Sequence, residues 1–388
     1  MTFFGLASYI YSAMKVFFHL RIKPVIIIFG GIILSPALLF LSRRKTNSDQ
    51  LRILIIPQST RIGDLVLTTP VFRAIKKKYP GAYLGVALSK KSAGIVKNNP
   101  HIDKIFILRS AGFWKDVLEI RKASFDWSFC LSGSALGNIV SLWCFIPNRA
   151  KITRRPRPFL EFLTDWLATY KLRYEHHTYL PRYYLRILKP LGINNSDAKS
   201  EIFISDSGEK GAEKYFKDKN IYPSDTVVGI SITAGNKIKE WGDEKFRKLA
   251  RKIKAKYNAK IIFIGGVADK NRIAKIFSDK NFFEATDFSL KELPSLIRRL
   301  TLYIAVDTGP IYIAHALNVP LVDIIGPVDP SEQPPSDKRS VQVLPAPGIK
   351  PSSFVLKKPG RLAEHKMAIE SIKVEDVLMA VDKLLTGL

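Results

Sequence analysis

The chain has 388 residues, and this length predicts two domains with separate hydrophobic cores. Apolar residues make up 46% of the sequence and charged residues 24%, a balance that excludes a wholly disordered chain. Sixty-one Lys and Arg residues against 34 Asp and Glu residues give a net charge of +27, which favours an anionic partner such as nucleic acid, anionic lipid or a phosphorylated substrate.

Two apolar stretches open the chain. Phe3 to Leu20 is rich in aromatic residues and interrupted by Lys15, whereas Pro24 to Leu41 carries no charge. At about 1.5 Å per residue the second stretch reaches about 27 Å, just enough for a hydrocarbon core of roughly 30 Å. A single span, a helical hairpin and an interfacial pair of helices remain open, with a buried core helix as the alternative. We expect residues 1–48 to form membrane-associating helices.

Residues 49–205 alternate apolar, β-branched runs with helical patterns, which predicts a Rossmann-like domain with a parallel sheet and right-handed crossovers. A helix is expected over Leu65 to Lys78, where apolar residues recur at helical spacing, and a short helix over Ser92 to Asn98. The predicted strands are Leu51 to Pro57, Tyr83 to Leu88, Lys104 to Leu108 and Trp127 to Leu131.

Asp64 directly follows the first predicted strand and lies at the start of a helix. Ligands of doubly wound sheets bind beyond the carboxyl ends of the strands, so this carboxylate is a candidate catalytic base. A helix N-cap is the other interpretation, because a carboxylate accepts backbone N–H bonds and suits the helix dipole. Residue spacing alone leaves both roles open.

The strand–helix alternation restarts in residues 206–360, after a polar stretch near residue 200, and predicts a second doubly wound domain. A helix is expected over Leu290 to Arg299, and residues 361–388 are expected to form a C-terminal helix. The predicted strands are Thr226 to Ile232, Lys260 to Ile264, Leu302 to Val306 and Leu321 to Ile325.

Asp307, Thr308, Gly309 and Pro310 follow a predicted strand and mark a helix start, because proline is favoured in the first turn. The free N–H groups of such a start bind anions and would suit a diphosphate, to which Gly309 lets the backbone approach closely. A plain helix start without a ligand is the alternative.

Lys239 and Trp241 belong to the loop after the Thr226 to Ile232 strand. A lysine there would neutralise the negative charge that develops on a leaving diphosphate. An ordinary surface lysine is the alternative, since Lys237 lies in the same loop.

Several common motifs are absent from the sequence. The two cysteines, Cys130 and Cys144, form no C-x-x-C pair, which excludes a disulfide scaffold and favours a reducing compartment. Neither H-E-x-x-H nor the D-x-D pair with which many sugar transferases hold a metal occurs, so we predict no metal site and no cofactor. The absence of G-x-G-x-x-G and of a P-loop motif disfavours dinucleotide oxidoreductases and P-loop nucleotide triphosphatases.

Three motifs occur in a fixed order: Gly-Asp within residues 53–82, K-x-W within residues 229–241 and D-T-G-P within residues 303–330. Together they resemble the ADP-heptose:lipopolysaccharide heptosyltransferase family (glycosyltransferase family nine) from about Leu51 to the C-terminus. The resemblance implies a GT-B fold, in which two Rossmann-like domains face each other across a cleft that holds the active site. It also implies an enzyme that inverts the anomeric centre and needs no tightly bound metal.

The resemblance implies a role for each matching residue. Asp64 matches the family's proposed base, which would deprotonate the acceptor hydroxyl as it attacks the anomeric carbon. Lys239 matches a lysine near the donor phosphates, and Thr308 and Gly309 match residues that bind the diphosphate. The donor-binding residues expected on this basis are Thr233, Asn236, Lys239, Trp241, Asp269, Asp307, Thr308, Gly309 and Pro310.

Some positions need separate treatment. Tyr312 stands where many family members carry histidine, His315 lies one helical turn on, and the run Ser331 to Gln333 is unusual for the family. Asp269 would hold the nucleoside. Asp307 would cap a helix or contact sugar hydroxyls, because a carboxylate repels phosphate.

The basic surplus of the chain fits an anionic acceptor at a membrane, although a solvated basic surface is the alternative for each cluster. We expect Arg61, Arg149 and Arg154 to bind the acceptor. Residues 49–205 would then form the acceptor domain and residues 206–360 the donor domain. Nucleotide-sugar pools are cytoplasmic, so the catalytic domains are expected on the cytoplasmic face of the inner membrane.

The sequence therefore predicts a glycosyltransferase that moves a sugar, heptose from ADP-heptose by resemblance, onto a lipopolysaccharide-type or other lipid-linked glycan. A family member with another donor, such as a UDP-sugar, and a non-catalytic nucleotide-sugar-binding membrane protein are the alternatives. A nucleic-acid partner is not expected, because the basic residues are spread along the chain and no recognised nucleic-acid motif occurs.

Overall fold

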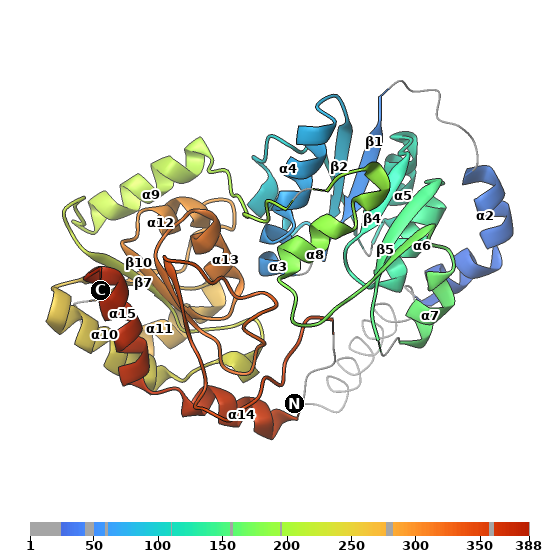
Figure 1. Cartoon of the computed structure of the whole chain (residues 1–388). Coiled ribbons are helices and arrows are strands. Elements are labelled where there is room, and N and C mark those ends of the chain that lie inside the picture. The colour runs from blue at the N-terminus through green and yellow to red at the C-terminus, as the bar shows by residue number, and fades with distance from the viewer. Residues whose placement is uncertain are drawn as a thin grey trace, which may run out of the picture.

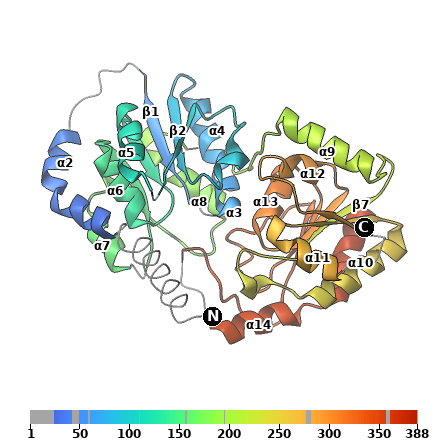
Figure 2. The ribbon, with the colours of Figure 1, turned by 180° about the vertical axis from the view of Figure 1, so that it is seen from behind.

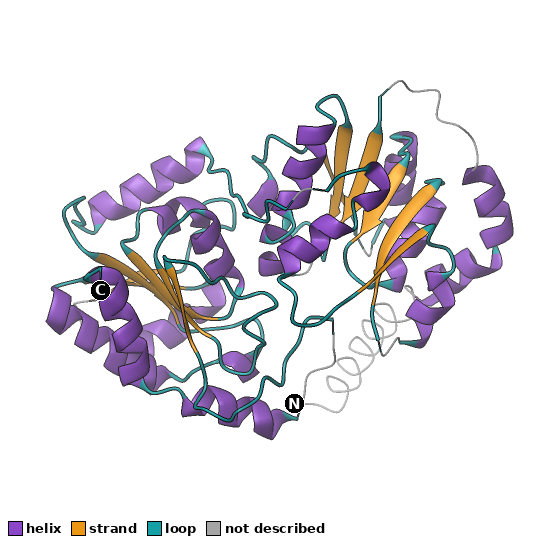
Figure 3. Cartoon of the chain, in the orientation of Figure 1, coloured by secondary structure: helices purple, strands orange, loops and turns teal. Residues whose placement is uncertain are grey.

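The structure is a computed structural model that describes residues 25–42, 50–58, 61–109, 111–155, 158–194, 196–276, 282–356 and 361–387. Two parallel sheets, each covered by helices, form two α/β domains that lie side by side (Figures 1 and 3). This is the two-domain organisation that the alternating sequence pattern predicts.

The first sheet runs in the order β3-β2-β1-β4-β5-β6, with parallel neighbours throughout the described pairs. Its first strand, Arg52–Ile56, is apolar and buried beyond its first residue, as expected for a strand covered on both faces. The strands are β1 Arg52–Ile56, β2 Tyr83–Leu88, β3 Lys104–Ile107, β4 Trp127–Cys130, β5 Asn148–Thr153 and β6 Tyr170–Arg173.

The helices of this domain bury one apolar side each. In α4 the residues Val71, Phe72 and Ile75 are buried, while three lysines occupy the last turn, where they suit the helix dipole. The described helices are α3 Ile62–Val66, α4 Thr69–Lys78, η1 Ala93–Val96, α5 Phe113–Lys122, α6 Ala135–Trp143, α7 Phe159–Asp165, α8 Leu180–Arg186 and η2 Lys189–Leu191.

The helix predicted over Leu65 to Lys78 is two helices, α3 and α4, and the prediction of one helix is wrong here. Pro70, in the first turn of α4, has no N–H to donate and its ring would clash with the Val66 carbonyl in a continuous helix. The Thr68 hydroxyl donates instead to the Asp64 carbonyl at 2.8 Å. The break leaves α3 as a separate turn at the end of β1, and Asp64 lies on it.

The second sheet runs in the order β9-β8-β7-β10-β11-β12, which repeats the topology of the first, with β7 and β10 in the places of β1 and β4. Both central strands are fully buried apolar runs, apart from Ser231 at the end of β7. The strands are β7 Val227–Ser231, β8 Lys260–Ile264, β9 Phe282–Ala285, β10 Leu302–Val306, β11 Leu321–Ile324 and β12 Ser340–Val343.

The C-terminal residues return to the second domain. Val377 and Val381 of α15 are buried in the same core as β7 and β10, and the single C-terminal helix that the sequence predicts is a pair, α14 and α15. The described helices of this domain are α9 Asp206–Asp218, η3 Lys237–Lys239, α10 Asp243–Tyr257, η4 Val267–Asp269, α11 Lys270–Ile276, α12 Leu293–Arg298, α13 Gly309–Ala316, α14 Leu362–Ser371 and α15 Val374–Leu385.

The helices Val25–Ile33 and α2 Ser35–Ser42 lie at the end of the first domain that points away from the second (Figures 1 and 2). A bend of 71° separates them. Within the described residues no single helix has the length and apolar character needed to cross a membrane, but this bent pair passes that test when its two helices are taken together. The remaining residues of the predicted N-terminal segment, 1–24 and 43–48, lie outside the described residues.

Candidate active site

The starts of two helices, one from each domain, meet between the domains. In each sheet the strand order reverses beside a central strand, and ligands of doubly wound folds bind at such points. α3 follows β1 at the reversal in the first sheet, and α13 follows β10 at the reversal in the second. A cavity of about 640 Å³ opens there, a volume typical of sites for small ligands.

Both domains line this cavity. The predicted residues that line it are Arg61, Asp64 and Arg154 from the first domain and Asn236, Lys239, Asp307, Thr308, Gly309 and Pro310 from the second. The lining residues that no predicted role covers are Gln58, Ile62, Gly63, Gly235, Tyr312, Val328, Gln333, Ser353, Phe354, Val355 and Leu356.

Two glycines allow α3 and α13 to touch. A Cβ atom on Gly63 would lie 2.7 Å from Cδ2 of Tyr312, and a Cβ atom on Gly309 would lie 2.9 Å from Cβ of Ile62. Both distances are shorter than van der Waals contact, so a side chain at either position would force the two helices apart. The close approach of the two domains therefore requires glycine at both positions.

Asp64 lies in the first turn of α3, where its side chain is 4% exposed. The N-cap of α3 is Arg61 and not Asp64, so the N-cap interpretation of this aspartate does not hold. Burial raises the pKa of the Asp64 carboxyl to about 6, against the opposing charges of Arg61 and Lys239. A carboxyl group that titrates near neutral pH inside a cavity has the properties of a general base.

Asp307 links Lys239 and Tyr312 in the part of the cavity lining that belongs to the second domain. Its carboxylate accepts a bond from Lys239 Nζ at 2.5 Å and another from the Tyr312 hydroxyl. Lys239 also donates to the Asp307 carbonyl at 3.3 Å. Asp307 is 2% exposed, so these donors compensate a charge that water does not reach.

The start of α13 presents backbone N–H groups to the cavity. Thr308 is its N-cap, and in the described structure no side chain caps this helix start. Gly309 and Pro310 follow, and both line the cavity. An uncapped helix start with a lysine beside it is suited to bind an anion.

The three arginines predicted to bind the acceptor differ in position. Arg61 and Arg154 line the cavity. Arg154 also forms a forked pair with Glu161, at 2.9 and 2.8 Å, and donates to the Leu356 carbonyl of the second domain at 2.9 Å. Arg149 is 4% exposed and donates to the carbonyls of residues 146, 147 and 167, so the structure gives it a place in the core of the first domain and not on the cavity.

Three of the predicted donor-binding residues lie outside the cavity lining. Trp241 is 3% exposed, packs edge-on against Phe246 and donates to the Ile372 carbonyl at 2.9 Å, because the apolar core of the second domain encloses it. Thr233 and Asp269 lie side by side after β7 and β8, with the Thr233 hydroxyl donating to Asp269 Oδ2 at 3.2 Å. Both residues follow the carboxyl ends of their strands in the second sheet, outside the cavity lining.

Gln333 reaches from the second domain to the candidate base. Its side-chain amide donates to Asp64 Oδ1 at 2.9 Å. The neighbouring Glu332 is fully buried and its carboxylate pairs with His176 at 2.9 Å and accepts from the Val355 N–H at 2.6 Å. The sequence marked this run only as unusual, and no spacing rule links it to a residue 269 positions away.

Tyr312 and His315 both belong to α13 but face different surroundings. Tyr312 is buried, lines the cavity and bonds to Asp307. His315 pairs with Asp337 through Nε2 at 3.0 Å and is outside the cavity lining. Tyr312 therefore takes the position facing the site, and His315 does not substitute for it. In the part of the chain that the structure describes, no group of three His, Cys, Asp or Glu side chains is arranged to hold a metal ion.

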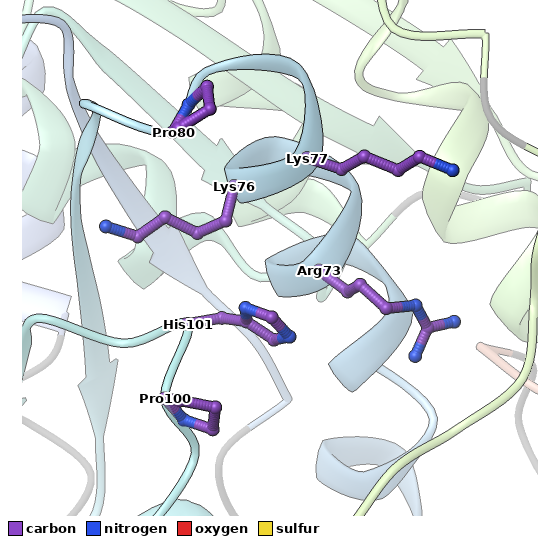
Figure 4. Close-up of a pocket in the computed structure, with 6 residues that line it drawn as sticks. All are labelled: Arg73, Lys76, Lys77, Pro80, Pro100 and His101. Carbon is purple, nitrogen blue, oxygen red and sulfur yellow. The ribbon is translucent and has the colours of Figure 1, made fainter.

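A second cavity, of about 480 Å³, lies on the first domain at α4 (Figure 4). Two of its three Lys and Arg side chains have acidic partners: Arg73 pairs with Glu201 at 2.7 Å and Lys76 with Asp103 at 2.6 Å. His101 lies 3.2 Å from the same Glu201. An anion would compete with these pairs, so the cavity between the domains is the stronger candidate site.

Known proteins resemble this chain over most of its length. A family profile described as glycosyltransferase family 9 (heptosyltransferase) matches residues 120–354. Lipopolysaccharide heptosyltransferase 3 of Escherichia coli (strain K12) is 26% identical over 346 residues, which cover 83% of this chain and 95% of that protein.

Two solved structures share the fold. The family 9 glycosyl transferase from Veillonella parvula aligns with a TM-score of 0.73 at 19% identity, over 89% of this chain and 100% of its own. The ADP-heptose lps heptosyltransferase II of E. coli aligns with a TM-score of 0.70 at 17% identity, over 87% of this chain and 99% of its own. These likenesses show two α/β domains arranged as in GT-B transferases.

Proposed function

Because the chain belongs to glycosyltransferase family 9, the heptosyltransferases, we propose that it transfers heptose from ADP-heptose to a lipopolysaccharide-type or other lipid-linked glycan, with inversion at the anomeric carbon. One observation carries the proposal: Asp64 of the first domain and Lys239 with the α13 start of the second line the same cavity. The choice of donor is supported by relatives named as heptosyltransferases, one of which has ADP-heptose in its name.

The donor would bind to the second domain, residues 206–360, with its diphosphate between Lys239 and the start of α13. The N–H groups after Thr308 and the Lys239 ammonium supply the positive ends that a diphosphate needs. Asp307 would repel the diphosphate less than a free carboxylate, because Lys239 and Tyr312 already donate to it.

The rest of the donor would extend along the edge of the second sheet. Asn236 lines the cavity next to Lys239 and would contact the sugar or the diphosphate. Thr233 and Asp269, bonded to each other beyond the ends of β7 and β8, would hold the nucleoside. Thr233 and Asn236 follow β7, which borders the strand-order reversal, and Asp269 follows the adjacent strand β8. This position supports the assignment, since nucleotides bind at such reversals in related folds.

The chemical step would be a single displacement. The Asp64 carboxylate takes the proton of the acceptor hydroxyl while that oxygen forms a bond to the anomeric carbon. The bond from this carbon to the diphosphate oxygen breaks, and the nucleoside diphosphate leaves with the electron pair. Lys239 and the α13 start stabilise the charge that develops on the leaving group. Attack on the face opposite the leaving group inverts the anomeric centre.

The acceptor would bind to the first domain, residues 49–205. Arg61 and Arg154 border the cavity on that side and would contact anionic groups of the glycan. The N-terminal residues 1–48 would keep the enzyme at the inner membrane, with its catalytic domains on the cytoplasmic face where the donor is made. The helices of residues 361–388 would complete the donor domain.

Two measurements test this function. In a thermal-shift screen of ADP-, UDP- and GDP-sugars, ADP-heptose should raise the melting temperature most, because a ligand that binds the folded state stabilises it. A larger rise with a UDP-sugar would overturn the choice of donor. Asp64→Asn should abolish transfer and keep the thermal shift by ADP-heptose. A wild-type protein that binds donor and transfers to no acceptor in a lipid extract would be a nucleotide-sugar-binding protein instead.

A further inference from the structure

The N-terminal helical pair is packed onto the first domain. Ile28 and Leu38 are buried in a cluster with Ile139 and Leu142 of α6. Trp143, at the end of α6, donates from its ring N–H to the Ile27 carbonyl at 3.4 Å. The pair is thus an added layer of the domain and not a detached helix.

The opposite side of this pair is apolar as well. Ile26, Phe29 and Ile33 are exposed and follow each other at helical spacings of three and four, so they share one face of their helix. Phe40 of α2 is 73% exposed. A helix on the surface of a soluble domain normally carries polar residues on its outer face, and the whole range 25–42 contains no charged residue.

Two neighbouring helices, α7 and α5, also carry apolar side chains on their exposed faces. On α7, Phe159 and Phe162 are 68% and 60% exposed, and Trp166 at its C-terminal end is 54% exposed on the same helical face. On α5, Trp114 and Leu118 are about half exposed and lie one turn apart. Of the seventeen large hydrophobic side chains exposed among the described residues, eleven belong to residues 25–42, to α5, and to α7 with its C-cap residue Trp166.

These side chains belong to one continuous region, which we call the outer apolar face: the exposed apolar residues of 25–42, α5 and α7, together with Trp166. The Trp114 ring meets the Trp143 ring edge-on at 4.8 Å between centroids, which connects α5 to the helical pair. Leu160 of α7 packs against the cluster that holds Ile28 and Leu38. Figures 1 and 2, which view the chain from opposite sides, both show the helical pair and α7 at the end of the first domain farthest from the second.

We propose that the outer apolar face rests in the interfacial layer of an anionic bilayer and holds the first domain flat against it. Exposed apolar regions of this extent mark interaction sites, and tryptophan is favoured at the boundary between lipid tails and headgroups. The helical pair is bent by 71° and half buried on protein, which suits a position in the plane of the interface.

The sequence that adjoins the outer apolar face indicates that lipid, and not a second copy of the chain, covers it. Residues 43–45, directly after α2, are Arg-Arg-Lys, and the net charge of the chain is +27. Two copies of so basic a chain would repel each other, whereas anionic headgroups attract both features. The 24 residues before the helical pair include the apolar stretch Phe3 to Leu20, which adds to the affinity for lipid.

The inference rests on the proposed function only for the choice of membrane, which is the one that carries the acceptor. It adds that residues far from the N-terminus in sequence, on α5 and α7, share in the attachment. Substitutions on α7 therefore separate the outer apolar face from the N-terminal residues 1–24.

Flotation of the purified full-length chain with vesicles tests the inference. The vesicles are a roughly three-to-one mixture of phosphatidylcholine and phosphatidylglycerol, compared with phosphatidylcholine alone. Phe159→Ser with Phe162→Ser and Trp166→Ser should lower binding to the anionic vesicles about tenfold. The double change Phe159→Ser with Phe162→Ser, which alters only side chains that are mostly exposed, should lower it less but in the same direction.

The matched control alters exposed hydrophobic residues elsewhere. Leu362→Ser with Met379→Ser on α14 and α15, where the side chains are 68% and 63% exposed, should leave vesicle binding unchanged. Binding equal to wild type in both α7 variants would overturn the inference. So would a dimer, measured by light scattering, that the α7 changes dissociate without altering vesicle binding. The thermal shift by ADP-heptose reports on the proposed function separately, because it involves no lipid.

Discussion

Gln333, from the second domain, donates its side-chain amide to Asp64, from the first, at 2.9 Å. This bond favours the ionised form of the Asp64 carboxyl, while burial favours the neutral form and raises its pKa to about 6. The protonation state of the proposed base therefore depends on how the two domains are joined.

Gln333→Ala should raise the pKa of Asp64 further, because it removes a hydrogen bond to the carboxylate. The acidic limb of the kcat/KM profile should move to higher pH by up to about one unit, the equivalent of one hydrogen bond. Gln58→Ala is the matched control, since Gln58 also lines the cavity. Equal displacement by both changes would show that the bond to Asp64 is not the cause.

The wild-type enzyme should lose activity in acid. A general base works only when deprotonated, so kcat/KM should fall about tenfold per pH unit below the Asp64 pKa of about 6 and level off above it. Steady-state rates across the range from about pH 5 to about pH 8 measure this. A flat profile through that range would exclude Asp64 as the base.

Asp64→Asn should stabilise the protein at neutral pH while it abolishes transfer. The folded-state pKa of Asp64 lies above its ordinary value of 3.8, so the folded state binds the proton more tightly than the unfolded state. The stability from that neutral form is complete below about pH 3.8 and is lost as pH rises through about 6, at a cost of at most about 3 kcal/mol.

The asparagine variant does not have this loss. Its melting temperature should therefore exceed that of wild type at about pH 7.5, and the difference should shrink at about pH 5. A difference that is the same at both values would contradict the assignment of the raised pKa to Asp64.

Lys239→Ala should raise the KM for the donor by about 10- to 100-fold, because it would remove the charge-assisted contact that we propose between Lys239 and the diphosphate. Lys237→Ala, which alters an exposed lysine at the start of the same short helix, should have little effect. Donor titrations of both variants make the comparison. Similar KM increases in both would attribute the effect to net charge and not to the position of Lys239.

Tyr312→Phe should weaken donor binding about threefold to tenfold, since it removes one of two donors from the buried Asp307 carboxylate and leaves more negative charge facing the diphosphate. Tyr312→His should restore part of the affinity, because the imidazole can donate to the same oxygen. Calorimetric titration with ADP measures both. Affinity unchanged in the phenylalanine variant would mean that the hydroxyl has no part in donor binding.

The central strands of both sheets could be predicted from the sequence. Tyr83 to Leu88 of the first sheet and Leu302 to Val306 of the second are strands over the predicted residues, because continuous apolar runs between turns have few alternatives. The inner strand β5, Asn148–Thr153, which pairs with β4 and β6, was not predicted. Its Lys151 is fully buried and pairs with Asp165 at 2.6 Å. Because charged residues are normally exposed, this lysine made a buried strand look like a surface segment in the sequence.

Some residues of the candidate site could likewise be predicted from the sequence, whereas others could not. Asp64, Lys239 and the residues from Asp307 to Pro310 each belong to a local motif at a strand end, and all of them line the cavity. Gln333 could not be found, because its contact with Asp64 depends on the docking of two domains. Trp241 and Arg149 were expected at the site, but their side chains point into apolar or carbonyl-lined interior, a direction that sequence spacing does not reveal.

Gly63 packs against Tyr312 and Gly309 packs against Ile62, with no room for a further atom between the two domains at either contact. Any relative motion of the two domains would therefore have to be a rotation about this contact, since sliding would bring the backbone of one helix into a side chain of the other. A rotation leaves points on its axis nearly stationary and carries distant ones through wide arcs. Asp64 and the start of α13 lie beside this contact. Such a rotation would therefore change the distance between the proposed base and the proposed phosphate site less than it would change the width of the outer part of the cavity.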